Sequence, residues 1–146
     1  MSALLEWIAT LAAGLFAGAA LYVSLVEHPA RASLGSRAAV HEFGPSYRRG
    51  ALMQAPLSLL GAAAGIGCWA TGASAAWLVG ALTLGALVPF TLLVIMPTNK
   101  RLLDPRLDAG SEAAAALLRR WARLHAVRTV VSLAVFAGFA ALAVWR

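Results

Sequence analysis

Residues 52–96 read LMQAPLSLLGAAAGIGCWA, then TGAS, then AAWLVGALTLGALVPFTLLVIM. Each apolar run has the length that a helix needs to cross a bilayer core, which is roughly 20 residues. The connection Thr71-Gly72-Ala73-Ser74 is short, so the two helices are expected to form an antiparallel hairpin. This segment therefore predicts an integral membrane protein.

Two further apolar segments flank the hairpin, at residues 4–26 and 125–145. All four are continuous runs of Leu, Ala, Val and Gly, which favours helices over the strict alternation of a β-barrel. We therefore expect an all-α fold, a four-helix transmembrane bundle with up-down-up-down order. It is expected to form one integral membrane domain over residues 1–146, with spans at about 4–26, 52–70, 75–96 and 125–145.

The composition excludes several classes of protein. Of the 146 residues, 61% are apolar and 12% are charged, whereas a soluble domain has about 25% charged residues. Disordered chains are poor in apolar residues, so the composition excludes a disordered chain as well as a soluble domain. The net charge of +6 is concentrated between the apolar runs, as in cytoplasmic loops, and no nucleic-acid partner is predicted. The single cysteine, Cys68, excludes an intrachain disulfide framework.

The basic residues predict the orientation in the membrane. Eleven of the twelve lie in residues 27–50 and 97–128, and the exception is Arg146. The positive-inside rule places these loops in the cytoplasm and both termini outside. We expect a multi-pass protein of a bacterial-type inner (plasma) membrane, whose first partner is the lipid bilayer, and a homo-oligomer stays open. An aromatic belt is expected at the outer interface, formed by Trp7, Trp69, Trp77 and Trp145.

Prolines are expected to end two of the membrane helices. Pro29 follows the first span and Pro97 the third, and the residue before a proline avoids the helical region. Gly44-Pro45-Ser46 predicts a break before the second span, which leaves residues 31–43 as a short interfacial helix.

Local signals also predict one helix start and several helix contacts. Ser111 followed by Glu112 is a favourable N-terminus, so the last helix is expected to begin near 112 and to extend beyond the bilayer on the cytoplasmic side. Two GxxxG pairs predict close helix approach, namely Gly14 with Gly18 and Gly61 with Gly65.

The last helix carries the most informative polar stripe. Trp121, His125, Arg128 and Ser132 are spaced by four, three and four residues, which places them on one helix face. A helix end at the membrane interface, with a tryptophan anchor and an arginine that reaches the phosphates, is the simpler interpretation. Lipid anchoring does not require an imidazole, however, so His125 favours a functional site.

The other three spans bring polar residues to the same side of the membrane. They are Tyr22, Glu27 and His28 from the first span, Tyr47 and Gln54 from the second, and Asn99 and Lys100 after the third. The opposite side has almost no titratable residue. Solvated helix ends and helix-to-helix hydrogen bonds are the alternatives. The asymmetry predicts a ligand pocket for a hydrophobic small molecule at the cytoplasmic side of the bundle.

Three motifs resemble the anthrone-oxygenase-like family of small four-helix integral membrane proteins. They are Glu27-His28-Pro29, Pro97-Thr98-Asn99-Lys100 and the segment from Trp121 through His125 to Arg128. The resemblance implies a cofactor-independent oxygenase that converts tricyclic anthrones to anthraquinones. It implies His125 as the catalytic base, with Arg128, Asn99 and Lys100 stabilising a phenolate. Substrate-binding roles then fall to Tyr22, Glu27, His28, Tyr47, Gln54 and Trp121.

The sequence leaves other functions open, including whether the protein is an enzyme at all. A small transporter would use Glu27 as an ion-coupling carboxylate, and a lipophile-binding or accessory membrane protein would use the pocket without catalysis. No HxxxH, HxxE or ExxH pair is present, so neither a metal nor another cofactor is expected. Haem or a metal at His28 and His125 remains the alternative.

Overall fold

The computed structural model of the chain describes residues 2–145, and every regular element in that range is a helix. Several elements join end to end without a break. In chain order they are α1 (Ser2–Tyr22), the π-helix η1 (Val23–Glu27), α2 (His28–Ser33), α3 (Ser36–Ala70), α4 (Ala75–Phe90), the π-helix η2 (Thr91–Ile95), α5 (Met96–Leu102) and α6 (Glu112–Val144). They form four long helices, each long and apolar enough to cross a membrane: Ala3–Ser33, Ser36–Ala70, Ala75–Leu102 and Glu112–Val144.

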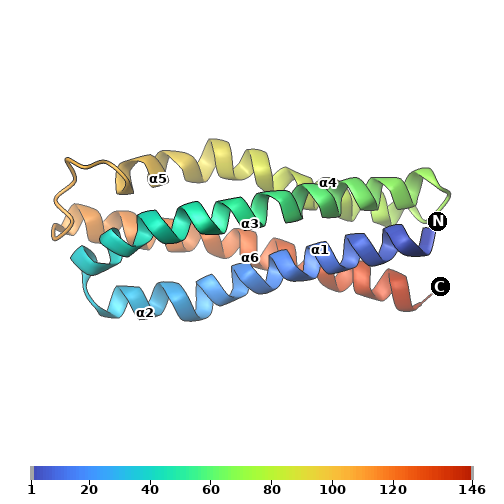
Figure 1. Cartoon of the computed structure of the whole chain (residues 1–146), viewed down its shortest axis with the longest axis horizontal. Helices are drawn as coiled ribbons and strands as arrows, with labels where there is room; N and C mark the ends of the chain where they lie inside the picture. The colour runs from blue at the N-terminus through green and yellow to red at the C-terminus, as the bar shows by residue number, and fades with distance from the viewer. Residues whose placement is uncertain (1, 146) are drawn as a thin grey trace.

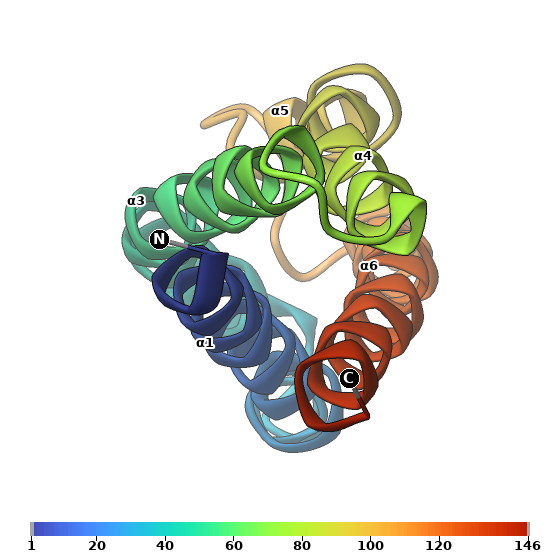
Figure 2. The same cartoon turned by 90° about the vertical axis from the view of Figure 1, so that its right-hand side faces the viewer.

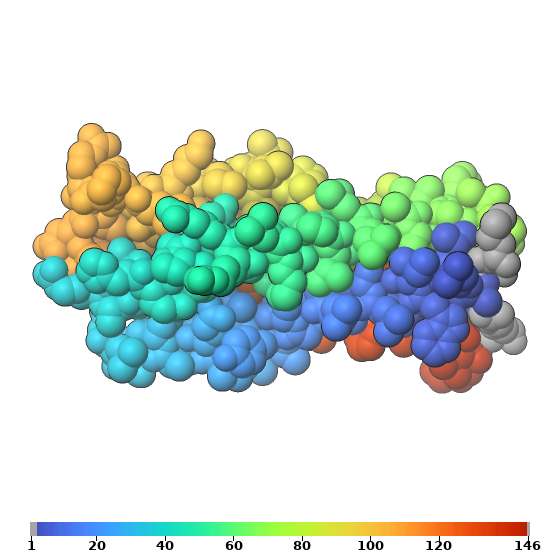
Figure 3. Space-filling view, in the orientation of Figure 1, coloured from blue at the N-terminus to red at the C-terminus, as the bar shows by residue number. Residues whose placement is uncertain are grey.

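The four long helices lie side by side as a bundle, and each returns along the one before it (Figure 1). Viewed from the end, they surround a common axis (Figure 2). Both ends of the chain lie at one end of the bundle, here called the terminal end, beside the α3–α4 connection. The α2–α3 turn and the α5–α6 connection lie at the opposite end, called the loop end. The space-filling view shows α3 packed between α1 and the α4–α5 helix (Figure 3). The predicted all-α four-helix fold is confirmed.

Pro29 and Pro97 do not end their helices, so that prediction was wrong. Each proline lies in the first turn of an α-helix that directly follows a π-helix. At the two junctions, the N–H of His28 donates to the carbonyl of Val23, and the N–H of Met96 donates to the carbonyl of Thr91. A proline in the first turn of the next helix is tolerated because the N–H it lacks has no α-helical partner there. The first and third helices therefore continue past their prolines.

The predicted break at Gly44-Pro45-Ser46 was also wrong. The chain turns earlier, at Leu34 and Gly35, and α3 then runs unbroken through Pro45 and Pro56. Gly35 has a φ of +88°, a conformation that favours glycine because it has no Cβ. The expected interfacial helix is instead split between α2 and the start of α3. Ala39 and Phe43, which precede Pro45 in α3, are completely buried, so this part of the helix packs inside the bundle.

Close packing of α3 on α4 explains one of the two GxxxG pairs. A Cβ at Gly61 would lie 2.7 Å from Cδ2 of Leu84, and one at Gly65 would lie 2.9 Å from Cβ of Ala81. In the first pair, a Cβ at Gly14 would lie 2.8 Å from the Phe136 ring, whereas nothing lies within 4 Å at Gly18. Three of the four glycines are therefore at close helix contacts.

The tryptophans divide between surface and core. Trp7, Trp69 and Trp145 are exposed, as an aromatic belt requires, but Trp77 is only 3% exposed. Its ring stacks on Phe139 with centroids 4.8 Å apart. The prediction was wrong for Trp77 because the side chain faces the bundle interior, where α4 lies against α6.

The α5–α6 connection is held by local contacts. Arg106 donates two side-chain hydrogen bonds to Asp104, and this pairing lowers the pKa of the Asp104 carboxyl. The Ser111 hydroxyl then accepts the N–H of Ala114 at 3.2 Å as the N-cap of α6. The predicted start of the last helix near residue 112 is confirmed.

Candidate functional site

A cavity of about 160 Å³ lies in the loop-end half of the bundle and is lined by all four long helices. Its walls are mainly apolar and include three aromatic rings. Phe43 and Tyr47 stack with centroids 5.7 Å apart, and Phe43 meets Trp121 edge-on at 5.4 Å. The Tyr47 hydroxyl donates to the sulfur of Met96 at 3.6 Å, which ties α3 to α5 across the cavity. The site is suited to a flat, hydrophobic ligand.

His125 is the buried imidazole of the cavity, with 4% of its surface exposed. It lies one helical turn after Trp121, and the two rings stack with centroids 4.7 Å apart and planes at 25°. Its Nδ1 lies 3.0 Å from the hydroxyl oxygen of Ser24 in η1. The ring is therefore fixed by a stacking partner on its own helix and by a hydrogen bond between Nδ1 and Ser24 of the first helix.

Arg128 brings a positive charge to the same cavity. Its Nη2 donates to Oε1 of Gln54 at 2.7 Å, and the guanidinium lies 5.3 Å from the centre of the Phe16 ring. Its Nε is buried with no hydrogen-bond partner among the described residues. Within residues 2–145 no carboxylate forms an ion pair with Arg128. Since Gln54 is neutral, the charge of Arg128 is not compensated.

Asn99 adds an unsatisfied acceptor. The side chain is 1% exposed and lines the cavity, and in the described part of the chain its Oδ1 has no hydrogen-bond partner. A buried polar atom without a partner is rare in proteins and typically costs about 1–3 kcal/mol. Asn99 and Arg128 together provide unused hydrogen-bonding capacity at one cavity.

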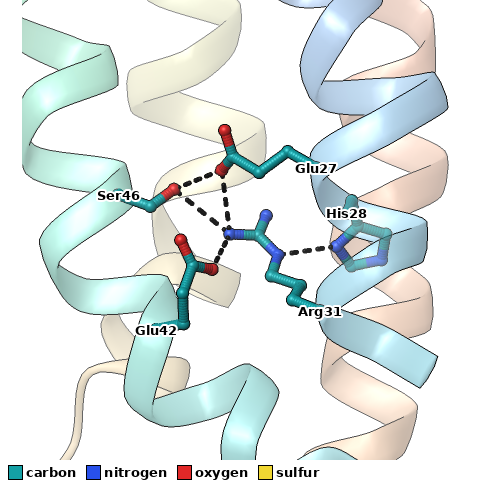
Figure 4. A network of polar contacts seen from close by, with 5 residues as sticks. All are labelled: Glu27, His28, Arg31, Glu42 and Ser46. Carbon is teal, nitrogen blue, oxygen red and sulfur yellow. Dashed lines mark hydrogen bonds and ion pairs between the residues drawn. The ribbon is translucent and has the colours of Figure 1, made fainter. Parts of the chain in front are cut away.

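Arg31 lines the loop end of the cavity, whereas the sequence predicts it only as one of the basic loop residues. Its Nη1 donates to Glu42 at 2.8 Å, to Glu27 at 3.3 Å and to Ser46 at 3.2 Å (Figure 4). Its Nε donates to Nδ1 of His28 at 3.2 Å, and the Ser46 hydroxyl donates to Glu27. Two carboxylates thus neutralise Arg31, in contrast to Arg128.

The guanidinium of Arg31 also lies over two aromatic walls of the cavity. It is 5.0 Å from the centre of the Trp121 ring and 5.6 Å from that of Phe43. Glu27 and Arg31 are four residues apart, a spacing that brings two side chains together on a helix. The expectation that Pro29 ends the helix hides this signal in the sequence.

The structure brings together most of the residues predicted for the site. Those that line the cavity are His125, Arg128, Asn99, Tyr47, Gln54 and Trp121. Glu27 and His28 lie next to it, in the Arg31 network.

Tyr22 and Lys100 are both exposed and do not line the cavity. Lys100 faces away because neighbouring residues of an α-helix are rotated by about 100°, and Asn99 faces inward. Within residues 2–145 no group of three or more His, Cys, Asp or Glu side chains is placed to hold a metal ion.

The cavity opens sideways between α3 and η2. Ala51 and Leu92 both line it, yet both are exposed, Leu92 to 55%. Both belong to helices long and apolar enough to cross a membrane. The opening therefore faces the region that a bilayer would occupy.

Comparison with known proteins identifies related sequences. A family model described as anthrone oxygenase matches residues 43–138, the segment that holds all six predicted residues lining the cavity. Anthrone oxygenase tpcL of Aspergillus fumigatus is 44% identical over 61 residues, a match that covers 38% of this chain and 37% of that protein. The matched region is thus well under half of that relative's length. No solved structure matches the chain.

Proposed function

The chain belongs to the anthrone oxygenase family, and from this premise we propose that it oxidises an anthrone-like aromatic substrate in the cavity without a cofactor. One observation carries the proposal. A buried imidazole and an uncompensated guanidinium, one helical turn apart on α6, face a cavity with aromatic walls.

The reaction requires a base and an anion site. An anthrone has an acidic CH₂ group between two aromatic rings, and His125 removes one of its protons. The anion places its charge on the ketone oxygen and transfers electrons to O₂, and a carbon–oxygen bond forms to give a peroxide at the former CH₂ carbon. Loss of the second proton from this carbon breaks the O–O bond, forms the new carbonyl and releases water. Anthrone and O₂ thus give anthraquinone and water, with O₂ as the oxidant.

The charges around the cavity support a position for the substrate oxygen beside Arg128. Arg31 already contacts Glu27 and Glu42, whereas Arg128 donates to the neutral Gln54 and, among the described residues, pairs with no carboxylate. An anionic oxygen is therefore attracted to Arg128, where a fixed charge in a water-poor site stabilises developing charge most strongly. Asn99 lines the same cavity and its amide NH₂ can donate to a substrate oxygen, while its free Oδ1 can accept from a substrate hydroxyl.

The shape of the cavity supports a hydrophobic substrate that arrives through the membrane. The stacked Phe43 and Tyr47 rings and the indole of Trp121 provide flat apolar surface. The opening between Ala51 and Leu92 gives a path from the lipid. We place the loop end in the cytoplasm of a bacterial-type inner membrane and both termini outside, because basic residues favour the cytoplasmic side.

The test is oxidation of a hydroxylated model anthrone by purified, chelator-treated protein in lipid nanodiscs under ¹⁸O₂. We expect one O₂ consumed per anthraquinone formed, with one ¹⁸O in the product, at a rate above that of empty nanodiscs. A rate equal to spontaneous oxidation contradicts the proposal. Activity that is lost on chelation and restored by one metal instead supports the alternative of a metal at His28 and His125.

Binding without turnover is the second candidate, because the same lateral opening suits a transporter or lipophile-binding protein. In that case the anthrone or anthraquinone quenches the fluorescence of Trp121 with no product formed. A transporter that uses Glu27 for ion coupling would have to release it from Arg31 and Ser46.

A further inference from the structure

A continuous chain of hydrogen bonds connects the His125 ring to the backbone of α1. Nδ1 of His125 lies 3.0 Å from Oγ of Ser24, and this oxygen lies 2.7 Å from Oγ1 of Thr129. Oγ1 of Thr129 in turn lies 3.1 Å from the carbonyl oxygen of Ala20 and 3.2 Å from that of His125. His125 and Thr129 are 4% and 5% exposed, so water does not compete easily for these contacts.

The carbonyl groups set the direction of this chain. A carbonyl oxygen only accepts, so the single hydroxyl proton of Thr129 is directed to the carbonyls of Ala20 and His125. Thr129 can then only accept from Ser24, which uses the single proton of Ser24. The remaining contact requires Nδ1 of His125 to donate to Ser24.

The opposite direction is less favourable. If Ser24 donated to Nδ1, Thr129 would have to donate to Ser24, and its oxygen would face two carbonyl oxygens with no proton between them. Buried acceptor atoms that face each other with no hydrogen between them cost free energy.

We propose that Ser24 and Thr129 are positioning residues that hold His125 as the Nδ1–H tautomer. A neutral imidazole carries one N–H, so Nε2 is then the nitrogen with the free lone pair. The role of Nε2 as the proton acceptor from substrate rests on the proposed function, whereas the tautomer itself does not. Without such a partner the imidazole would distribute its proton between the two nitrogens.

The helices place these residues by their register. Ala20 and Ser24 are one turn apart on the first helix, and His125 and Thr129 are one turn apart on α6. The two pairs therefore face each other, and the Thr129 hydroxyl contacts the other three residues. Ser24 lies inside the π-helix η1, and π segments occur frequently at functional sites.

The direct test is ¹⁵N–¹H NMR of histidine-labelled protein in nanodiscs, with the His125 signals assigned by their loss in His125→Gln. Wild-type protein is expected to show a protonated Nδ1 and an unprotonated Nε2 at His125. A protonated Nε2 with an unprotonated Nδ1 in the wild-type protein overturns the proposal, and the His125→Gln variant serves only to assign the signals.

Variants then test the positioning role. Ser24→Ala is expected to give a mixture of tautomers or Nε2–H, while Ser24→Thr keeps a hydroxyl and restores Nδ1–H. Ser33→Ala is the matched control, because the Ser33 hydroxyl is exposed and donates to the carbonyl of Ala30. An unchanged tautomer in Ser24→Ala overturns the role of Ser24, and the His28 and His41 signals report whether each variant is folded.

Activity gives an independent measurement. Loss of a partner that orients a metal-bound histidine typically costs about 10- to 100-fold, and Ser24→Ala is expected to lower kcat by a similar factor with little change in KM. Recovery in Ser24→Thr is expected, and equal kcat for Ser24→Ala and wild type contradicts the positioning role. If NMR gives Nδ1–H and no anthrone is oxidised, only the proposed function fails. If anthrone is oxidised and NMR gives Nε2–H, only this inference fails.

Discussion

Two arginines of equal formal charge have different roles at this cavity because their partners differ. Arg31 is held by two carboxylates, a serine and a histidine, and its charge is used within the protein. Arg128 is held by one neutral amide and has a buried Nε without a partner among the described residues. Of these two arginines, it is Arg128 whose charge is available to a ligand.

Arg128→Ala is therefore expected to lower kcat for anthrone oxidation by about 10²–10³, the usual loss on removing one group that stabilises an oxyanion. The measurement is anthraquinone formation at saturating substrate. Arg123→Ala is the matched control, since Arg123 is an exposed arginine on the same helix and does not line the cavity. An equal effect of the two substitutions would show that Arg128 acts only through the net charge of the loop end.

For single residues, the sequence predicts which side chains share a face of one helix. It does not predict contacts between side chains of two different helices. Trp121, His125 and Arg128 share a face of α6, and helical spacing alone brings them together. Ser24 contributes through partners on another helix, so no local pattern points to it. Arg31 follows Glu27 by four residues, but this spacing is a signal only in a helix that continues through Pro29. The family resemblance implies Lys100 beside Asn99, but the helix turns Lys100 to the surface.

Among the helices, the two π-segments explain the largest difference from the sequence-based expectation. Proline is read as a helix end because its ring clashes with the preceding turn and it lacks an N–H. Where a π-turn precedes it, the proline starts a new α-helical turn, and hydrophobic periodicity gives no sign of this change. The Thr71–Ser74 connection and the Ser111 cap were predictable because their signals are local.

Helix packing makes a prediction for two glycines of the GxxxG pairs. Gly65→Ala is expected to lower the free energy of unfolding by about 1–3 kcal/mol, because its Cβ would lie 2.9 Å from Cβ of Ala81. Gly18→Ala is the matched control, since nothing lies within 4 Å of its position and alanine favours helix by about 0.5–1 kcal/mol. Thermal unfolding followed by circular dichroism in detergent compares them. A Gly65→Ala protein as stable as Gly18→Ala would contradict the close packing of α3 on α4.

The whole molecule is asymmetric along the bundle axis: each half has a buried apolar cluster, but the loop half also holds the cavity and most of the basic residues. Composition and charge predicted the class, the four membrane helices and a polar loop end, because these depend on sums over many residues. The lateral opening was not predictable, since it depends on how far α3 and η2 separate.

The lateral opening predicts how a hydrophobic substrate enters. Ala51→Trp is expected to lower kcat/KM by about tenfold, a change of about 1.4 kcal/mol in the free energy of reaching the transition state. Ala63→Trp, at an exposed position of α3 that does not line the cavity, is the control. Equal kcat/KM for both variants would place the substrate path elsewhere.

The basic loops predict the orientation of the molecule in the membrane. In a Cys68→Ala background, cysteines at Arg37 and Arg106, both at the loop end, are expected to resist an impermeant thiol reagent in intact cells. A cysteine at Ala75, at the terminal end, is expected to react. If both loop-end cysteines are labelled and the one at Ala75 is protected, the true orientation is the opposite of the predicted one.

In the proposed function, His125 acts as the base for oxidation by O₂ in this cavity. The most direct measurement is the rate of anthraquinone formation by chelator-treated His125→Ala protein beside wild type, both in nanodiscs and both shown to be folded. Removal of a general base is expected to lower this rate by about 10²–10⁴. A His125→Ala protein that oxidises the anthrone as fast as wild type would contradict the claim.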